Sequence, residues 1–221
     1  MSVLNILLSE ARVAAAPTFH AQGTVVANGG TTSNTGALPT RSTNDILIME
    51  LFVSIASLTF SINSGVPAGW VQGDTVTNTT GTMAWFWRIV DGAEAAPLIS
   101  WGGATANSTS FIYSFSGAKS SPIGATEHTN GTTNPMTAAA LTTTAKNSLI
   151  FFMGGVQAAQ TSIPTPASYT IAGVVSLGAV SPAIIAADQS VAASGGASTA
   201  VSISASVAGN WMTMELELKA N

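Results

Sequence analysis

The sequence contains no cysteine and very little charge. The absence of cysteine excludes disulfide bonds and metal sites built from thiolates. Lys, Arg, Asp and Glu together make up 7% of the 221 residues, whereas typical soluble domains contain about 25%. A hydrophobic content of 46% with so few charges is the reverse of the composition of disordered chains. The chain is therefore expected to fold.

Basic residues are too few and too scattered to form a nucleic-acid-binding surface. The net charge is -4 and the sequence pI is about 4.9. Proteins that bind nucleic acid neutralise phosphates with clustered Lys and Arg side chains. Here the six basic residues are Arg12, Arg41, Arg88, Lys119, Lys146 and Lys219. No nucleic-acid partner is expected.

No segment has the pattern of a membrane helix or of a secretory signal. The longest apolar region, Ile46–Ile62, is interrupted by Glu50 and several serines, so it lacks the 18 apolar residues that a spanning helix needs. The N-terminal stretch Met1–Leu8 is apolar, but no basic residue precedes it. Neither a membrane partner nor a secretory leader is expected.

The motifs of common catalytic and cofactor sites are also missing. The sequence has no Gly-x-Ser-x-Gly elbow and no His-Glu-x-x-His zinc motif, and no Walker lysine follows Gly102-Gly103 or Gly195-Gly196. His20 and His128 are the only histidines, and both lie among loop-type residues, where a lone histidine is usually solvated. No catalytic, cofactor-binding or metal-binding residue is predicted, and no cofactor.

Carboxylates could pair as they do in glycosidases, but their spacing selects no pair. Asp45 and Asp91 are typical of turns, and Glu215 and Glu217 are expected on the solvated face of the last strand. The candidates are Asp45, Glu50, Asp74, Asp91, Glu94, Asp188, Glu215 and Glu217. A carbohydrate-active enzyme is a hypothesis that requires two of them to converge in a cleft.

Apolar runs and alternation predict an all-β chain. Ile46–Val53 and Ser148–Val156 are near-continuous apolar runs, typical of buried strands. Met83–Val90 and Trp211–Leu218 alternate, and the first is apolar on both faces, so it should be covered on both sides. Further strands are expected at Thr18–Ala27, Leu58–Ile62, Pro97–Trp101, Thr109–Phe115, Ala138–Thr144, Ser168–Leu177, Pro182–Val191 and Thr199–Ser206.

The spacing of these runs predicts a jelly-roll-like antiparallel β-sandwich of about 10–13 strands. The polar segment Lys119–Pro135 is expected to be a long loop, and Val71–Gly81 a loop or a weak hairpin. Residues 1–16 are the only plausible helix, and form a predicted N-terminal arm that either packs on the domain or docks on a neighbouring subunit. Residues 17–221 are expected to form a single sandwich domain, because no linker divides them.

The low charge predicts an assembled protein. A compact monomer of 22.2 kDa exposes about 9,400 Å², which leaves roughly 600 Å² for each charged side chain, several-fold sparser than usual. Such a surface is either neutral and polar or covered by other subunits. Because large apolar patches mark interfaces, we expect a homo-oligomer, for which a trimer is one arrangement, or a larger assembly.

Five tryptophans raise the alternative of carbohydrate binding, because exposed aromatic faces stack on sugars. Trp85 and Trp87 share one face of a strand and are expected in the core. Trp70, Trp101 and Trp211 lie at strand ends, where one of them could reach a rim and bind a ligand.

Several short motifs carry a resemblance to known proteins: Asn44-Asp45 before Ile46–Val53, Pro67-Ala68-Gly69-Trp70, Trp85-Phe86-Trp87-Arg88, Gly92-Ala93-Glu94, Tyr113–Gly117 followed by Pro122, Ser148-Leu149-Ile150 and Trp211–Leu218. With these motifs the chain resembles, from Leu38 to about Leu218, β-sandwich proteins encoded in tailed phages and prophages. The family usually has Gly-Asp where this chain has Asn44-Asp45. Its members are virion structural components: capsid decoration proteins, head fibres, and tail or tail-tip parts.

This resemblance implies a non-enzymatic structural component of a tailed phage virion, and it brings no catalytic residue. The expected role is an outer capsid decoration or cement protein that assembles through apolar, charge-poor interfaces. Its expected partners are other copies of itself and the major capsid protein or another virion protein, on the outer surface of the particle. The alternative is a tail-fibre or tail-tip adhesin for a host surface glycan, which requires an exposed tryptophan in a groove.

Overall fold

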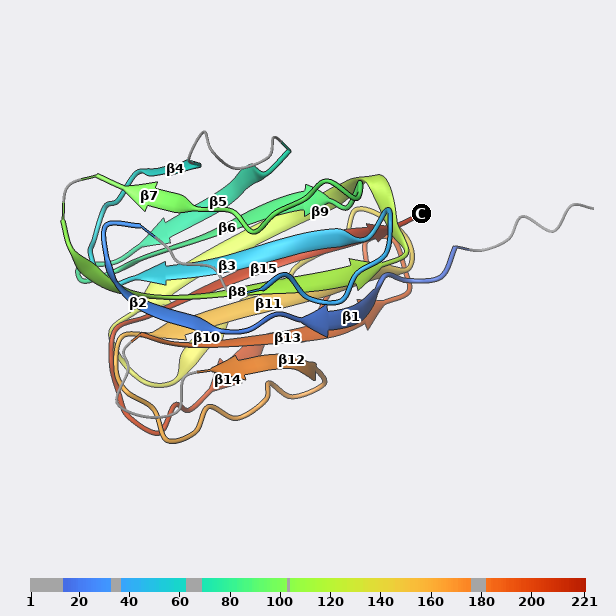
Figure 1. Ribbon diagram of the computed structural model, residues 1–221. Helices are drawn as coiled ribbons and strands as arrows, with labels where there is room; N and C mark the ends of the chain where they lie inside the picture. Colours follow the sequence, from blue (N-terminus) through green and yellow to red (C-terminus); the bar gives the residue numbers. More distant parts are fainter. Residues whose placement is uncertain (1–13, 33–36, 63–68, 103, 176–181) are drawn as a thin grey trace, which may run out of the picture.

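The computed structural model describes residues 14–32, 37–62, 69–102, 104–175 and 182–221. These residues form fifteen strands, and all strand pairs among them are antiparallel, so the prediction of an all-β sandwich is confirmed (Figure 1). This part of the chain contains no helix that could span a membrane. Most of the predicted N-terminal arm, residues 1–13, lies outside the described residues, and residues 14–16 have no regular secondary structure.

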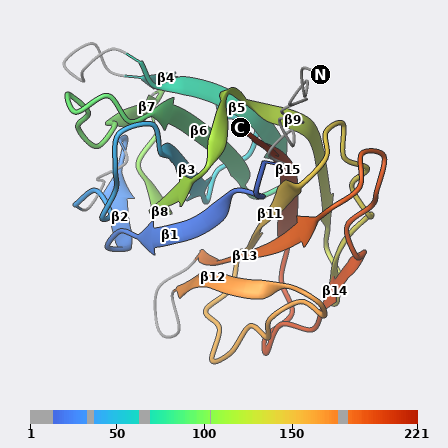
Figure 2. The same cartoon turned by 90° about the vertical axis from the view of Figure 1, so that its right-hand side faces the viewer.

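Two sheets pack face to face and form the centre of the molecule (Figure 2). The first sheet has the order β1-β8-β3-β6-β5, with β2 also paired to β8; its strands are β1 (Thr18–Gln22), β2 (Val26–Gly30), β3 (Ile46–Val53), β5 (Val71–Thr77), β6 (Thr82–Ile89) and β8 (Ala106–Ser116). The second sheet has the order β12-β13-β11-β15-β9; its strands are β9 (Ala118–Gly131), β11 (Ser148–Val156), β12 (Thr170–Val175), β13 (Ala183–Val191) and β15 (Trp211–Ala220).

The central hydrophobic core lies between these two sheets. It is built from alternate residues of the middle strands, such as Ile48 and Phe52 of β3 and Phe151 and Met153 of β11, which are fully buried. The ring of Tyr113 in β8 packs edge-on against Phe151, with ring centroids 5.0 Å apart. Each fully buried side chain of this size contributes about 1.5–3 kcal/mol, so this layer is the main source of stability.

Two short ribbons cover the outer faces of the sheets (Figure 2). The pair β4 (Phe60–Ile62) and β7 (Ile99–Trp101) packs on the outer face of the first sheet, and the pair β10 (Met136–Ala138) and β14 (Val201–Ile203) on that of the second. The sandwich therefore has three hydrophobic cores. This layering explains why β3, β6 and β11 are apolar on both faces, as the sequence predicted for Met83–Val90.

Two polar segments, one predicted as a loop and one as a loop or a weak hairpin, contain edge strands. The predicted loop Lys119–Pro135 is mostly β9, which pairs with β15, and Val71–Gly81 contains β5, which pairs with β6. Both strands lie at the edge of a sheet, where one side of the strand meets solvent, and this position permits their Ser, Thr, Asn and Gly content. Polarity at these edges was therefore misread as loop character.

Register shifts occur where the outermost strands pair with their neighbours. Such bulges interrupt β1, β5, β9 and β12, the strands at the ends of the two sheet orders. The pairs of β3 with β6 and β8, and of β11 with β13 and β15, run without interruption. The middle of each sheet is thus regular and its margins are irregular.

Candidate functional site

A large share of the few charged side chains lies inside the fold. Five of those in the described residues are buried, which is rare for such residues: Asp45, Glu50, Arg88, Glu215 and Glu217. Those classed as exposed are Asp91, Lys119, Glu127 and Lys146. Glu215 and Glu217 were predicted on a solvated face; this prediction is wrong, because the outer ribbon and loops cover that face of β15.

Glu217 is the best-satisfied charge in the structure. Its carboxylate accepts hydrogen bonds from the amides of Ala125, Thr144 and Ala145 at 2.9 to 3.0 Å. The hydroxyls of Thr144 and Ser148 donate to it at 2.6 and 2.5 Å. These groups come from β9, from the loop before β11 and from β11 itself, so a single carboxylate at the end of β15 joins three segments.

The surroundings of Glu217 favour its charged form. Burial alone would raise the pKa of Glu217, but the hydroxyls of Ser148 and Thr144 and the neighbouring amides lower it to about 2. Gly124 makes room for the carboxylate, because a Cβ at this position would collide with Glu217. The group therefore remains ionised over the whole physiological range and acts as a structural clamp.

Glu215, two residues earlier on the same face, has the opposite electrostatic character. It is 1% exposed, accepts a 2.6 Å hydrogen bond from the hydroxyl of Tyr169, and has the hydroxyl of Ser198 3.4 Å away. Burial raises the pKa of Glu215 to about 7; the two hydroxyls oppose this shift and the charge of Glu127 adds to it. Glu215 therefore titrates near neutral pH.

A third buried carboxyl lies between the two sheets. Glu50 is fully buried in the middle of β3, and the hydroxyl of Tyr113 donates a 3.0 Å hydrogen bond to its Oε2 atom. The Oε1 atom has no hydrogen-bond partner. Burial raises the pKa of Glu50 well above its usual range, although the bond from Tyr113 opposes this. Glu50 is thus a strained polar group in an otherwise apolar layer.

Replacing both members of this pair with apolar residues is expected to stabilise the protein. The double variant Glu50→Met/Tyr113→Phe should raise the free energy of unfolding at pH 7 by about 2 kcal/mol, because no buried polar group is left unpaired. Tyr113→Phe alone should lower it by about 1 kcal/mol, since Glu50 then loses its hydrogen bond. Urea unfolding at pH 7 measures both; a double variant less stable than the single one would contradict the description of Glu50.

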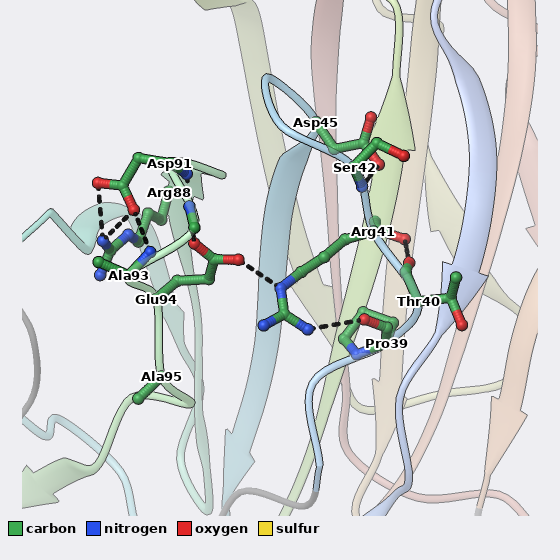
Figure 3. Close-up of polar contacts among 12 residues, drawn as sticks. Pro39, Thr40, Arg41, Ser42, Asp45, Arg88, Asp91, Ala93, Glu94 and Ala95 are labelled. Carbon is green, nitrogen blue, oxygen red and sulfur yellow. Dashed lines mark hydrogen bonds and ion pairs between the residues drawn. The ribbon is translucent and has the colours of Figure 1, made fainter.

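The carboxylates Glu94 and Asp91 organise a turn at the end of the first sheet (Figure 3). Arg41 Nε donates a 2.6 Å bond to Glu94, whose other oxygen accepts from the Gly92 amide at 2.7 Å. Arg88 Nη2 contacts both oxygens of Asp91 at 2.8 and 3.0 Å. Burial would raise the pKa of Glu94, but these donors lower it to about 2. Asp91 and Glu94 are thus turn residues, as predicted for Asp91.

Both histidines lie on strands and contact aspartates. His20 lies within the predicted strand Thr18–Ala27, whereas His128 was predicted in a loop. His20 of β1 contacts Asp45 at 2.8 Å, and the buried Asp45 also accepts from a turn amide, as expected of a turn residue. His128 of β9 contacts Asp74 of β5 at 2.6 Å and so joins the edges of the two sheets. No group of three or more His, Asp or Glu in the described residues could hold a metal ion.

The burial of the five tryptophans agrees only in part with the prediction. Trp87, predicted to be in the core, is only partly buried. Its neighbour Trp85 is 2% exposed, as predicted, because Gly73 of β5 has no side chain that would collide with the indole. The three tryptophans at strand ends, one of which could have reached a rim, are all buried: Trp70, Trp101 and Trp211. Trp87 is therefore the tryptophan that a ligand could reach.

A groove runs past Trp87 at the end of the sandwich where β6 ends and β9 begins. It consists of two adjoining clefts of about 210 and 280 Å³ that share Ser120. The smaller cleft is lined by Trp87, Ser120, Ser121, Pro122 and Ile123. The larger is lined by Asn44, Ile89, Ala118, Lys119, Ser120 and Asn221. Neither lining includes an aspartate or a glutamate.

The groove lies where the pairing of β9 with β15 becomes irregular. Register shifts occur on either side of the pair of Ile123 with Leu218, before Ala118 pairs with Ala220. On the opposite wall, Trp87 pairs with Val71 of β5, which is 47% exposed. Trp87 and Ile89 of β6 are only partly buried and line the groove, whereas their partners on β3, Ile48 and Ile46, are fully buried.

Comparisons with known proteins do not add a second line of argument. No family model, no curated protein and no solved structure matches the chain. The function is therefore argued from the geometry of the chain itself, together with the resemblance described above.

Proposed function

We propose that this protein is a structural subunit of a tailed phage virion, and that it decorates the outside of the capsid. The observation that carries the proposal is the distribution of charge. Asp45, Glu50, Arg88, Glu215 and Glu217 are buried within the fold, so the surface carries even fewer charges than the composition suggested. A surface of this kind associates through shape and apolar contact rather than through ion pairs.

Large apolar side chains are exposed at three places on the part of the surface that the structure describes. Val71 on β5 is 47% exposed, Leu98 before β7 is 37% exposed, and Val207 before β15 is 45% exposed. No Lys, Arg, Asp or Glu is adjacent to any of them in the sequence. Contacts to the major capsid protein or to other copies of the subunit could use these places.

The interior of the fold also suits a passive subunit of a shell. Its three hydrophobic cores are stacked on central strands that pair without interruption, and Glu217 and Glu94 fix the loops at the sheet ends. The buried carboxyls hold strands and loops together, and neither lining of the groove brings two carboxylates into a cleft. These arrangements support a mechanical role.

The assembly is expected to resist salt. Because exposed ion pairs are screened at high ionic strength and apolar contacts are not, raising NaCl about twentyfold, from about 0.05 to about 1 M, should leave the mass of the oligomer unchanged. Light scattering after size-exclusion chromatography measures this mass. Dissociation of the oligomer at 1 M NaCl, or a monomer at every concentration, would contradict assembly through charge-poor interfaces.

The location on a particle can be tested directly. Phage particles that carry the protein should show it by electron cryomicroscopy as density on the outer capsid surface, in a number that follows the capsid symmetry. Washing the particles in 1 M NaCl should leave this density in place. Density confined to the tail would contradict the proposed decoration role.

A further inference from the structure

We propose that the groove beside Trp87 binds a saccharide, with a pyranose ring stacked on the indole and the next ring in the adjoining cleft. This site goes beyond the assembly function, and it lies beside Val71, one of the exposed apolar side chains, because Val71 pairs with Trp87. The proposal depends on the aromatic platform, on the polar groups around it and on the size of the two clefts.

The partly exposed indole of Trp87 is the first element of the site. One face of a pyranose ring carries C–H groups that pack on an aromatic ring, while its hydroxyls stay free for hydrogen bonds. Ile123 and Pro122 line the same cleft as Trp87. They complete an apolar surface on which a ring can lie flat. The contrast with Trp85, two residues earlier and 2% exposed, shows that the fold can bury an indole on this face.

The polar groups of the groove match the hydroxyls of a sugar. Asn44 and Asn221 can each donate and accept through their amides, and Ser120 and Ser121 through their hydroxyls. Lys119 adds an exposed ammonium group that donates only. With no carboxylate in either lining, the groove has neither the acid pair of a glycosidase nor a set of oxygen ligands for a cation. It is equipped to hold a polyol without reacting with it.

The dimensions of the groove indicate how much ligand it takes. Clefts of 210 and 280 Å³ are smaller than the pockets of about 300–1,000 Å³ that enclose drug-sized ligands. Each has room for one small ring, and the two meet at Ser120. A chain of two linked pyranose units would therefore lie across Ser120, with one unit against Trp87 and Ile123.

A glycan array tests the proposal. The full chain is applied to immobilised oligosaccharides built from hexoses, N-acetylhexosamines and uronic acids, and at least one class should bind. That glycan should then protect the protein from quenching of its tryptophan fluorescence by acrylamide, because Trp87 is the tryptophan that the quencher reaches. Trp87→Ala should weaken binding about tenfold or more and Trp87→Phe about threefold, since the ring is lost in one variant and kept in the other.

Two further variants separate the site from general effects on folding. Ser120→Gln fills the point where the clefts meet without removing any buried atom, and it should also abolish binding. Leu98→Ala removes an exposed apolar side chain elsewhere and should bind like the wild type. Absence of binding to every glycan on the array would overturn the proposal, as would binding that survives both Trp87→Ala and Ser120→Gln. None of these results depends on the oligomeric state.

Discussion

Replacement of Glu217 by glutamine is expected to lower the free energy of unfolding by about 3 kcal/mol at pH 7. The carboxylate accepts from five donors, on Ala125, Thr144, Ala145 and Ser148. Glutamine keeps one acceptor oxygen but places an NH₂ group against buried N–H and O–H donors, which then lose their partner. The lowered pKa of about 2 gives a similar magnitude, because each pKa unit corresponds to about 1.4 kcal/mol.

Urea unfolding followed by circular dichroism measures this effect. In the wild type, the contribution of Glu217 is present above pH 4.5 and is lost as the pH falls towards 2, because the folded state binds the proton more weakly than the unfolded state. Glu217→Gln should lack this acid-dependent loss. A variant as stable as the wild type at pH 7 would show that the hydrogen bonds around Glu217 contribute little.

The opposite pH dependence is expected for Glu215. Its pKa is raised from 4.5 to about 7, so the folded state holds the proton more tightly than the unfolded state. The contribution of Glu215 to the free energy of unfolding is therefore fully present below pH 4.5, and about 3 kcal/mol is lost as the pH rises through 7. Glu215→Gln cannot ionise, and its hydrogen bond from Tyr169 can be kept. Between pH 4.5 and 8, the free energy of unfolding of this variant should fall by about 3 kcal/mol less than that of the wild type.

The two glutamates serve as matched controls, because they lie on the same strand and face and are two residues apart. Glu217→Gln should still lose stability as the pH rises to neutral, because it keeps Glu215. Glu215→Gln should still lose stability in acid, because it keeps Glu217. Burial raises the pKa of Asp188 to about 6. Asp188 should therefore leave, in both variants, a smaller dependence of the free energy of unfolding on pH. Together these groups place the maximum stability of the wild type at about pH 5. A wild-type curve that is flat between pH 5 and 8 would contradict the burial of Glu215.

The strands that cross the middle of the sheets could be predicted from the sequence. Ile46–Val53 and Ser148–Val156 have the predicted bounds, because strands covered on both faces are continuous apolar runs. The edge strands β5 and β9 could not be predicted from the sequence, because their polar composition is the same as that of a loop. Their strand character comes from pairing with β6 and β15, and β15 is some ninety residues further along the chain from β9.

The positions of the acidic residues were beyond prediction for a different reason. Alternation in Trp211–Leu218 correctly separates two faces, but alternation cannot show that a second layer covers the polar one. The donors to Glu217 and Glu215 lie on the loop before β11 and on residues such as Tyr169 and Ser198, which sequence spacing does not connect. The partial exposure of Trp87 was not predicted either, because it depends on the irregular pairing of β9 and not on the sequence of the strand that contains Trp87.

The bulges in β1, β5, β9 and β12 have a consequence for copies held at high density. A regular outer strand offers a row of free amides and carbonyls to which another chain can add, and natural sheets prevent this by distorting their borders. Here the distortion occurs in the four outermost strands of the two sheet orders, whereas the short strand β2 pairs with β8 without a register shift. Crowded neighbours therefore meet few regular borders to which a strand could add, and this charge-poor polypeptide has a barrier to ribbons and fibrils that does not depend on charge repulsion.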